Sequence, residues 1–94
     1  MHIGACVVTL HLEASGSLKD KRQVVRSLQD RLRRKFNVAV AEVEHQDLWQ
    51  RAALGIVAIS TSAEHVEQQL ASAADEIDRV EPGLVTRTEL EFLA

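Results

Sequence analysis

The apolar and polar residues of this chain alternate with two different periods, and the periods divide it into six elements. Apolar side chains that recur every three or four positions indicate two amphipathic helices, at residues 17–35 and 61–80. Short stretches rich in Val, Ile, Leu and Ala, bounded by turn residues, predict four strands. These strands span residues 2–13, 38–45, 52–59 and 84–93. The predicted order is therefore β-α-β-β-α-β.

Both predicted helices carry terminal signals. Ser17 is the expected N-cap of the first helix, with Asp20 three positions later as a weak capping box. Thr61 and Glu64 form the corresponding pair for the second helix. The Glu-Pro-Gly run at residues 81–83 should end that helix, because proline cannot continue it and glycine tolerates the turn.

The charge of each strand predicts its place in the sheet. The first and third strands are apolar in both alternation classes, whereas the second and fourth carry charges. Right-handed crossovers then favour a ferredoxin-like α+β domain over residues 1–94. This fold is a two-layer sandwich with a four-stranded antiparallel sheet, central first and third strands, and both helices on one face. The other sheet face would stay apolar, which predicts a homo-oligomer such as a homodimer. The alternative is that small residues such as Ala5 and Gly55 make the open face flat but tolerable.

The first helix concentrates the positive charge of the protein. Residues 17–35 hold eight of the eleven basic residues and two of the fourteen acidic ones, giving a formal charge of +6 against −9 for the rest. Cations in a first helical turn oppose the helix dipole, and a bound anion would relieve this. We therefore expect RNA or ribosomal phosphates as the partner. The alternative is a solvated face on which Asp20 and Asp30 offset the charge. The candidate anion-binding residues are Lys19, Lys21, Arg22, Arg26, Arg33 and Arg34.

Aromatic residues are scarce, which limits how nucleic acid could bind. The chain has no Tyr, one Trp and two Phe, and none lies in the first or third strand. Bases therefore have nothing to stack on at the centre of the sheet, so any RNA should contact the helices through its phosphates. The polar connection at residues 46–51 is a candidate interaction loop through Asp47, Trp49 and Arg51, although Trp49 could instead cover the core.

No pattern in the chain indicates an established catalytic site. We expect no catalytic residues, no cofactor and no metal, since Glu42, Glu44, His45 and Asp47 do not have the spacing of a ligand set. One enzymatic alternative is phosphate-ester or acyl-phosphate chemistry at the first helix N-terminus, which would require Asn37 close to Lys19.

The single cysteine, the apolar runs and the N-terminus of the chain predict its cellular location. Cys6 is the single cysteine and lies in an apolar strand, which is typical of a buried residue in a reducing compartment. There is no apolar run of about 20 residues and no secretory leader. We therefore expect a cytoplasmic protein without a membrane partner.

Two motifs resemble those of a known family. They are Ser-Leu-Lys-Asp-Lys-Arg at residues 17–22 and Gln-Asp-Leu-Trp-Gln-Arg at residues 46–51, with Phe-Asn-Val-Ala-Val-Ala-Glu at residues 36–42 between them. In these motifs and over residues 1 to about 92 the chain resembles the YlxP-like family of small uncharacterised bacterial proteins. The resemblance implies a ferredoxin-like fold and a gene neighbourhood with translation and ribosome-maturation factors. It implies no activity and no catalytic residues.

Overall fold

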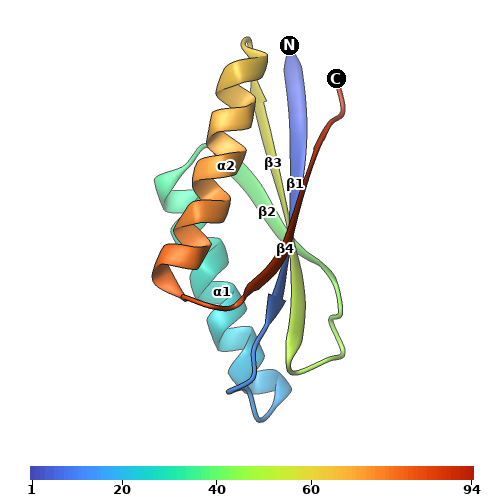
Figure 1. Cartoon of the computed structure of the whole chain (residues 1–94), viewed down its shortest axis with the longest axis vertical. Coiled ribbons are helices and arrows are strands. Elements are labelled where there is room, and N and C mark those ends of the chain that lie inside the picture. The colour runs from blue at the N-terminus through green and yellow to red at the C-terminus, as the bar shows by residue number, and fades with distance from the viewer.

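A computed structural model describes all residues from Met1 to Ala94. The six predicted elements are present in the predicted order, and each boundary lies within a few residues of the one expected from the sequence (Figure 1). The elements are β1 (His2–His11), α1 (Leu18–Lys35), β2 (Val38–Glu44), β3 (Arg51–Ser60), α2 (Ala63–Val80) and β4 (Val85–Phe92).

The four strands form one antiparallel sheet in the order β2-β3-β1-β4. The two strands that are apolar on both faces, β1 and β3, are central, and the charged strands β2 and β4 are the edges. Both helices cover the same face of the sheet, as Figure 1 shows. The ferredoxin-like α+β fold predicted from the sequence is therefore confirmed.

The core lies between this sheet face and the helices. Every second residue of β1, including Cys6, Val8 and Leu10, is buried there beside Leu54 and Ile56 of β3. The helix α2 packs over β1 and β3, whereas α1 packs over β2.

A glycine allows α2 to approach the sheet closely. A Cβ added to Gly4 would lie 2.7 Å from Val66 Cγ1 and 3.1 Å from Leu70 Cδ1. Any side chain at this position would therefore press α2 away from β1.

The helix caps agree with the sequence in one case and differ in the other. Ser17 Oγ accepts a hydrogen bond from the Asp20 backbone N–H at 3.1 Å, as predicted. The N-cap of α2 is Ser62, whose Oγ accepts from the His65 N–H at 3.2 Å. The expected Thr61–Glu64 pair was therefore wrong by one residue, because two neighbouring hydroxyl residues can each satisfy the capping pattern.

The sheet face away from the helices is open in the single chain. Residues paired across antiparallel strands share a face, so Ile59 lies beside Ile3, and Val57 beside Ala5. Val57 is 39% exposed, Ile59 51% and Val43 44%. The open face, defined by these five residues, is thus an uncovered apolar surface. Neither helix has the length and apolar character needed to cross a lipid bilayer.

Candidate functional site

The eight cations of α1 do not form one surface. A helix turns about 100° per residue, so its positions can be assigned to faces. Seven of the cations lie on two separate flanks of the helix, and the eighth, Lys21, lies between the flanks on the buried stripe.

Lys21 is an interior residue, and its assignment as an anion-binding residue was wrong. Its side chain is 0% exposed. The Nζ atom donates hydrogen bonds to the backbone oxygens of His45 at 2.7 Å, Gln46 at 3.1 Å and Arg51 at 3.3 Å. Position 21 lies on the buried stripe of Val25, Leu28 and Leu32. The prediction counted every cation of the helix as exposed, but a lysine can be buried where acceptors surround its ammonium group.

An ion pair completes the surroundings of Lys21. Glu42 Oε2 lies 3.0 Å from Nζ but accepts no hydrogen bond, because an ammonium group has three N–H donors and three carbonyls take them. The carboxylate therefore balances the charge, while the carbonyls fix the geometry. No donor is left for an external ligand.

The first turn of α1 is already capped by the chain itself. Besides the Ser17 cap, Asp20 Oδ2 accepts a hydrogen bond from the Gly16 backbone N–H at 3.0 Å. A carboxylate in the first turn also offsets the dipole that the cations oppose. Because Lys21 is buried as well, the first turn is less suited to bind an anion than the sequence indicated.

One flank of α1, here called the outer flank, lies toward β2 and carries four exposed cations. They fall within about 60° of arc around the helix and extend over about 21 Å of its axis. Arg33 Nη2 donates to the Val40 backbone oxygen of β2 at 2.8 Å, and Arg33 Nη1 lies 3.6 Å from Asp30 Oδ1. The outer flank consists of Lys19, Arg22, Arg26 and Arg33.

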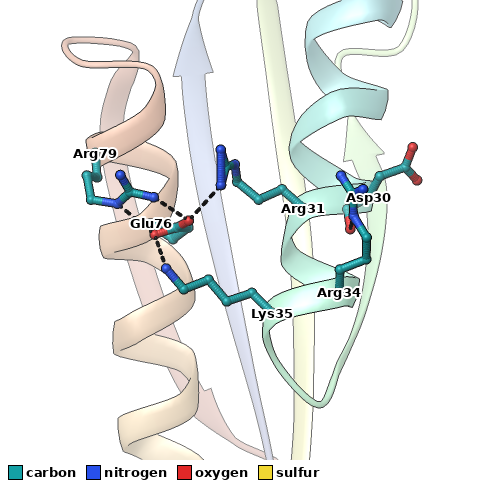
Figure 2. Close-up of polar contacts among 6 residues, drawn as sticks. All are labelled: Asp30, Arg31, Arg34, Lys35, Glu76 and Arg79. Atoms are coloured by element: carbon teal, nitrogen blue, oxygen red, sulfur yellow. Dashed lines mark hydrogen bonds and ion pairs between the residues drawn. The ribbon is translucent and has the colours of Figure 1, made fainter.

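The other flank faces α2, where three cations surround one buried carboxylate (Figure 2). Glu76, whose side chain is 4% exposed, accepts hydrogen bonds from Arg79 Nε at 2.9 Å and Arg79 Nη2 at 2.8 Å. Lys35 Nζ donates to the same carboxylate at 3.0 Å, and Arg31 Nη1 at 3.4 Å. We call this group the Glu76 cluster. The sequence offered a signal that was not used: Glu76 adjoins Ile77 and lies three residues after Ala73, both on the buried stripe.

The Glu76 cluster is held in its charged form. The hydrogen bonds from Arg79 and then Lys35 lower the pKa of Glu76 from 4.5 to about 2. The same contacts with Glu76 raise the pKa of Arg79. At neutral pH the cluster therefore joins the two helices through one carboxylate and three cations.

A shallow depression lies on the same flank, here called the α1 depression. It is lined by Ser27, Arg31, Arg34 and Lys35, with no hydrophobic side chain. Arg34 Nε donates to the Asp30 backbone oxygen at 3.3 Å, and Figure 2 shows its side chain beside Asp30, away from Glu76. Of the cations predicted to bind an anion, Arg34 alone lies here. Arg31 and Lys35 were not among them.

The candidate interaction loop is held from inside by Lys21. The backbone of His45 has a φ of 64°, which is uncommon for a residue with a side chain. Leu48 is 43% exposed and Trp49 51% exposed. The interpretation of Trp49 as a cover for the core is therefore wrong, and its indole lies at the surface of the loop. Asp47 and Arg51 are exposed as well.

The structure does not provide the elements of the enzymatic alternative. Lys19 and Asn37 lie at opposite ends of α1, about 25 Å apart along the helix axis, so Asn37 cannot act beside the first turn. Cys6 is buried, and burial raises the pKa of its thiol, which disfavours the nucleophilic thiolate.

Solved structures support the fold. One similar structure is that of a protein from Nitrosomonas europaea proposed to be an antibiotic biosynthesis monooxygenase. The match covers 99% of this chain and 89% of that protein, with a TM-score of 0.58 and 7% identity. SnoaB, a cofactor-independent oxygenase from Streptomyces nogalater, matches 98% of this chain and 91% of its own, with a TM-score of 0.57 and 13% identity. At such low identity these matches show a shared architecture and no shared activity.

Sequence comparison is more specific. The chain is 40% identical to the uncharacterized protein YlxP of Bacillus subtilis (strain 168) over 81 residues, which are 80% of this chain and 84% of that protein. The family model described as "Protein of unknown function (DUF503)" matches residues 3–90. The YlxP-like resemblance is confirmed, and the chain belongs to the DUF503 family.

Proposed function

We propose that this protein is a small cytoplasmic binding protein that docks the phosphates of RNA, as on the ribosome, through the exposed cations of α1. The observation that carries the proposal is the outer flank. Lys19, Arg22 and Arg26 form no ion pair within the chain. Three neighbouring cations without internal partners are available to neutralise phosphates.

The distribution of charge supports an oriented contact. The protein carries a formal net charge of −3, yet seven exposed cations lie along α1. Glu89 and Glu91 of β4 lie on the sheet face opposite the helices, since they pair with Val7 and Ala5. A polyanion would therefore be attracted to the helix layer and repelled from the acidic edge of the open face.

The test is salt-dependent binding with charge-reversal variants. Binding of a ribosomal RNA fragment should weaken as the salt concentration rises from about 50 to 200 mM. The cations of the protein release counterions from the phosphates, and this release is less favourable at higher salt. The variant Arg22→Glu/Arg26→Glu should bind at least about tenfold more weakly at low salt. Arg87→Glu, a single charge reversal, is the control on another surface, because Arg87 is exposed on the opposite face, where it pairs with Thr9.

Two results would contradict the proposal. One is the absence of RNA binding at low salt. The other is equal weakening per reversed charge in the outer-flank variant and in the Arg87 control, which would indicate dependence on net charge instead of on a defined surface.

A second candidate function is a homo-oligomeric interaction module. The supporting observation is the open face, where Val57 and Ile59 are exposed beside Ile3 and Ala5. A second copy could cover this apolar surface. Sedimentation velocity at micromolar concentration should show a dimer that Ile59→Glu dissociates. A strict monomer in the unaltered protein would eliminate this candidate.

The Trp49 loop offers a different protein contact within the second candidate. Trp49 and Leu48 are exposed on a loop whose backbone Lys21 holds, so the aromatic side chain is presented with little loss of backbone freedom on binding. Affinity capture from an extract, compared between the unaltered protein and Trp49→Ala, tests this contact. Proteins retained equally by both forms would count against the loop.

A further inference from the structure

The α1 depression has the features of a site for a phosphate group, separate from the outer flank. Ser27, Arg31 and Arg34 follow one another at spacings of four and three residues, so they lie on one face of α1, and Lys35 closes the depression on the α2 side. The lining is entirely polar. A nucleobase or an apolar group would find no hydrophobic contact there, whereas an anionic oxygen would find donors.

Several of these donors are not used within the protein. Arg31 donates to Glu76 through Nη1, which leaves Nε and Nη2 without an acceptor. Arg34 donates through Nε to the Asp30 backbone, which leaves both of its Nη atoms. Lys35 gives one of its three N–H groups to Glu76. Guanidinium groups bind phosphate oxygens through paired N–H bonds, so the free donors suit such a ligand.

The charge balance indicates a ligand with more than one negative charge. In the Glu76 cluster three cations meet one carboxylate, which leaves a formal charge of +2, and Arg34 adds a further cation nearby. A phosphodiester carries one negative charge, whereas a phosphomonoester carries close to two above its second pKa of about 6.

Glu76 also prepares the site before a ligand arrives. Its side chain is 4% exposed and accepts hydrogen bonds from both Arg31 and Lys35. These two long side chains are therefore partly ordered in the free protein. Ordering them in advance reduces the entropy lost on binding. A cluster that served only to join the helices would not require a polar depression lined by side chains with unused donors.

We propose that the α1 depression binds a phosphomonoester dianion. The terminal phosphate of an RNA chain is the source that matches the outer flank, and this assignment of source rests on the proposed function. A free phosphorylated small molecule has the same chemistry, so the experiment separates the two sources.

Methyl phosphate and dimethyl phosphate form a matched pair of probes. They differ by one methyl group, and at pH 7.5 the first carries close to two negative charges and the second carries one. Nitrogen-15 NMR at pH 7.5 would follow the Nε–Hε signals of the arginine side chains. Methyl phosphate should shift the Arg31 and Arg34 signals saturably and bind at least about tenfold more tightly than dimethyl phosphate. Arg34→Gln should weaken the binding of methyl phosphate about tenfold, and Arg87→Gln, on the open sheet face, should not. Equal binding of the two probes, or no dependence on Arg34, would overturn the proposal.

A second pair of probes identifies the source. An oligoribonucleotide with a 5′-phosphate should bind more tightly than the same sequence with a 5′-hydroxyl, and Arg34→Gln should remove the difference. If methyl phosphate binds and neither oligonucleotide does, the depression is a site for small phosphorylated molecules and the RNA proposal fails. If both oligonucleotides bind equally and methyl phosphate causes no shift, the outer flank explains the RNA binding and this inference is wrong.

Discussion

Lys21 Nζ lies 3.0 Å from Glu42 Oε2 inside the protein. It donates to two backbone oxygens on the connection between β2 and β3, and to that of Arg51, the first residue of β3. One side chain of α1 thereby fixes the loop that carries the exposed Trp49. Lys21 belongs to the Ser-Leu-Lys-Asp-Lys-Arg motif at residues 17–22, and the loop that it holds contains the Gln-Asp-Leu-Trp-Gln-Arg motif at residues 46–51. The two motifs therefore belong to one structural unit.

Removing the buried ammonium should destabilise the protein and release the loop. Lys21→Met retains the aliphatic length but leaves Glu42 unpaired and three carbonyls without donors, which should cost about 3 kcal/mol of unfolding free energy. Denaturant unfolding measures this loss, and hydrogen exchange at residues 46–51 measures the release. Lys19→Met, two residues earlier and exposed, is the control and should change stability by less than about 0.5 kcal/mol. Equal stability of the two variants would contradict the structural role of Lys21.

The Glu76 cluster predicts a specific dependence of stability on pH. The pKa of Glu76 is about 2 in the folded protein, below its ordinary 4.5, so its stabilising contribution is complete above about pH 4.5 and is lost as the pH falls toward 2. The stability difference between the unaltered protein and Glu76→Gln should therefore shrink over this range. Glu67→Gln, on an exposed position of α2, should leave the shape of the curve unchanged. A difference that stays constant from pH 5 to about 2 would show that the charge of Glu76 does not contribute.

The close approach of α2 to β1 can be tested at Gly4. Gly4→Ala places a methyl group 2.7 Å from Val66 Cγ1, so it should destabilise the fold by about 1–3 kcal/mol. Gly16→Ala is the matched control, because the nearest atom to its added Cβ is Asp20 Oδ2 at an ordinary 3.5 Å. Thermal unfolding of both variants would show the contrast. A Gly4 variant as stable as the control would mean that the helix can shift without cost.

The number of phosphates contacted by the outer flank can be measured from the salt dependence of RNA binding. Each cation that neutralises a phosphate of single-stranded RNA contributes about −0.7 to the slope of log affinity against log salt. Arg22→Gln/Arg26→Gln should therefore reduce the magnitude of the slope by about 1.4. Arg87→Gln should leave it unchanged. An unaltered slope in the outer-flank variant would place the phosphate contacts elsewhere.

The fold could be predicted from the sequence because its determinants are local or periodic. The two apolar alternation classes of β1 and β3 marked them as central strands, and the stripe of Val25, Leu28 and Leu32 marked the buried face of α1. The helix boundaries followed from capping chemistry to within a residue or two. The existence of an uncovered apolar sheet face also followed, since two helices can cover only one face.

The candidate site depended on contacts between distant segments. Both Lys21 and Arg22 are cations, but Lys21 lies on the helix stripe of Val25 and is buried, whereas Arg22 is exposed. The difference arises because His45, Gln46 and Arg51 bring backbone oxygens to position 21 from 24 to 30 residues away. Such acceptors leave no trace in the local pattern of charges.

The sequence alone determined the order of elements, the sheet topology and the concentration of positive charge on one helix, because side-chain periodicity and composition dictate these. Only the tertiary structure decided how that charge is divided. Burial next to backbone acceptors took Lys21 inside, the carboxylate of Glu76 drew Arg31 and Lys35 toward α2, and the remaining cations stayed on the outer flank. The physical reason is that a charge can leave water only where the fold supplies partners for it, and those partners come from distant parts of the chain.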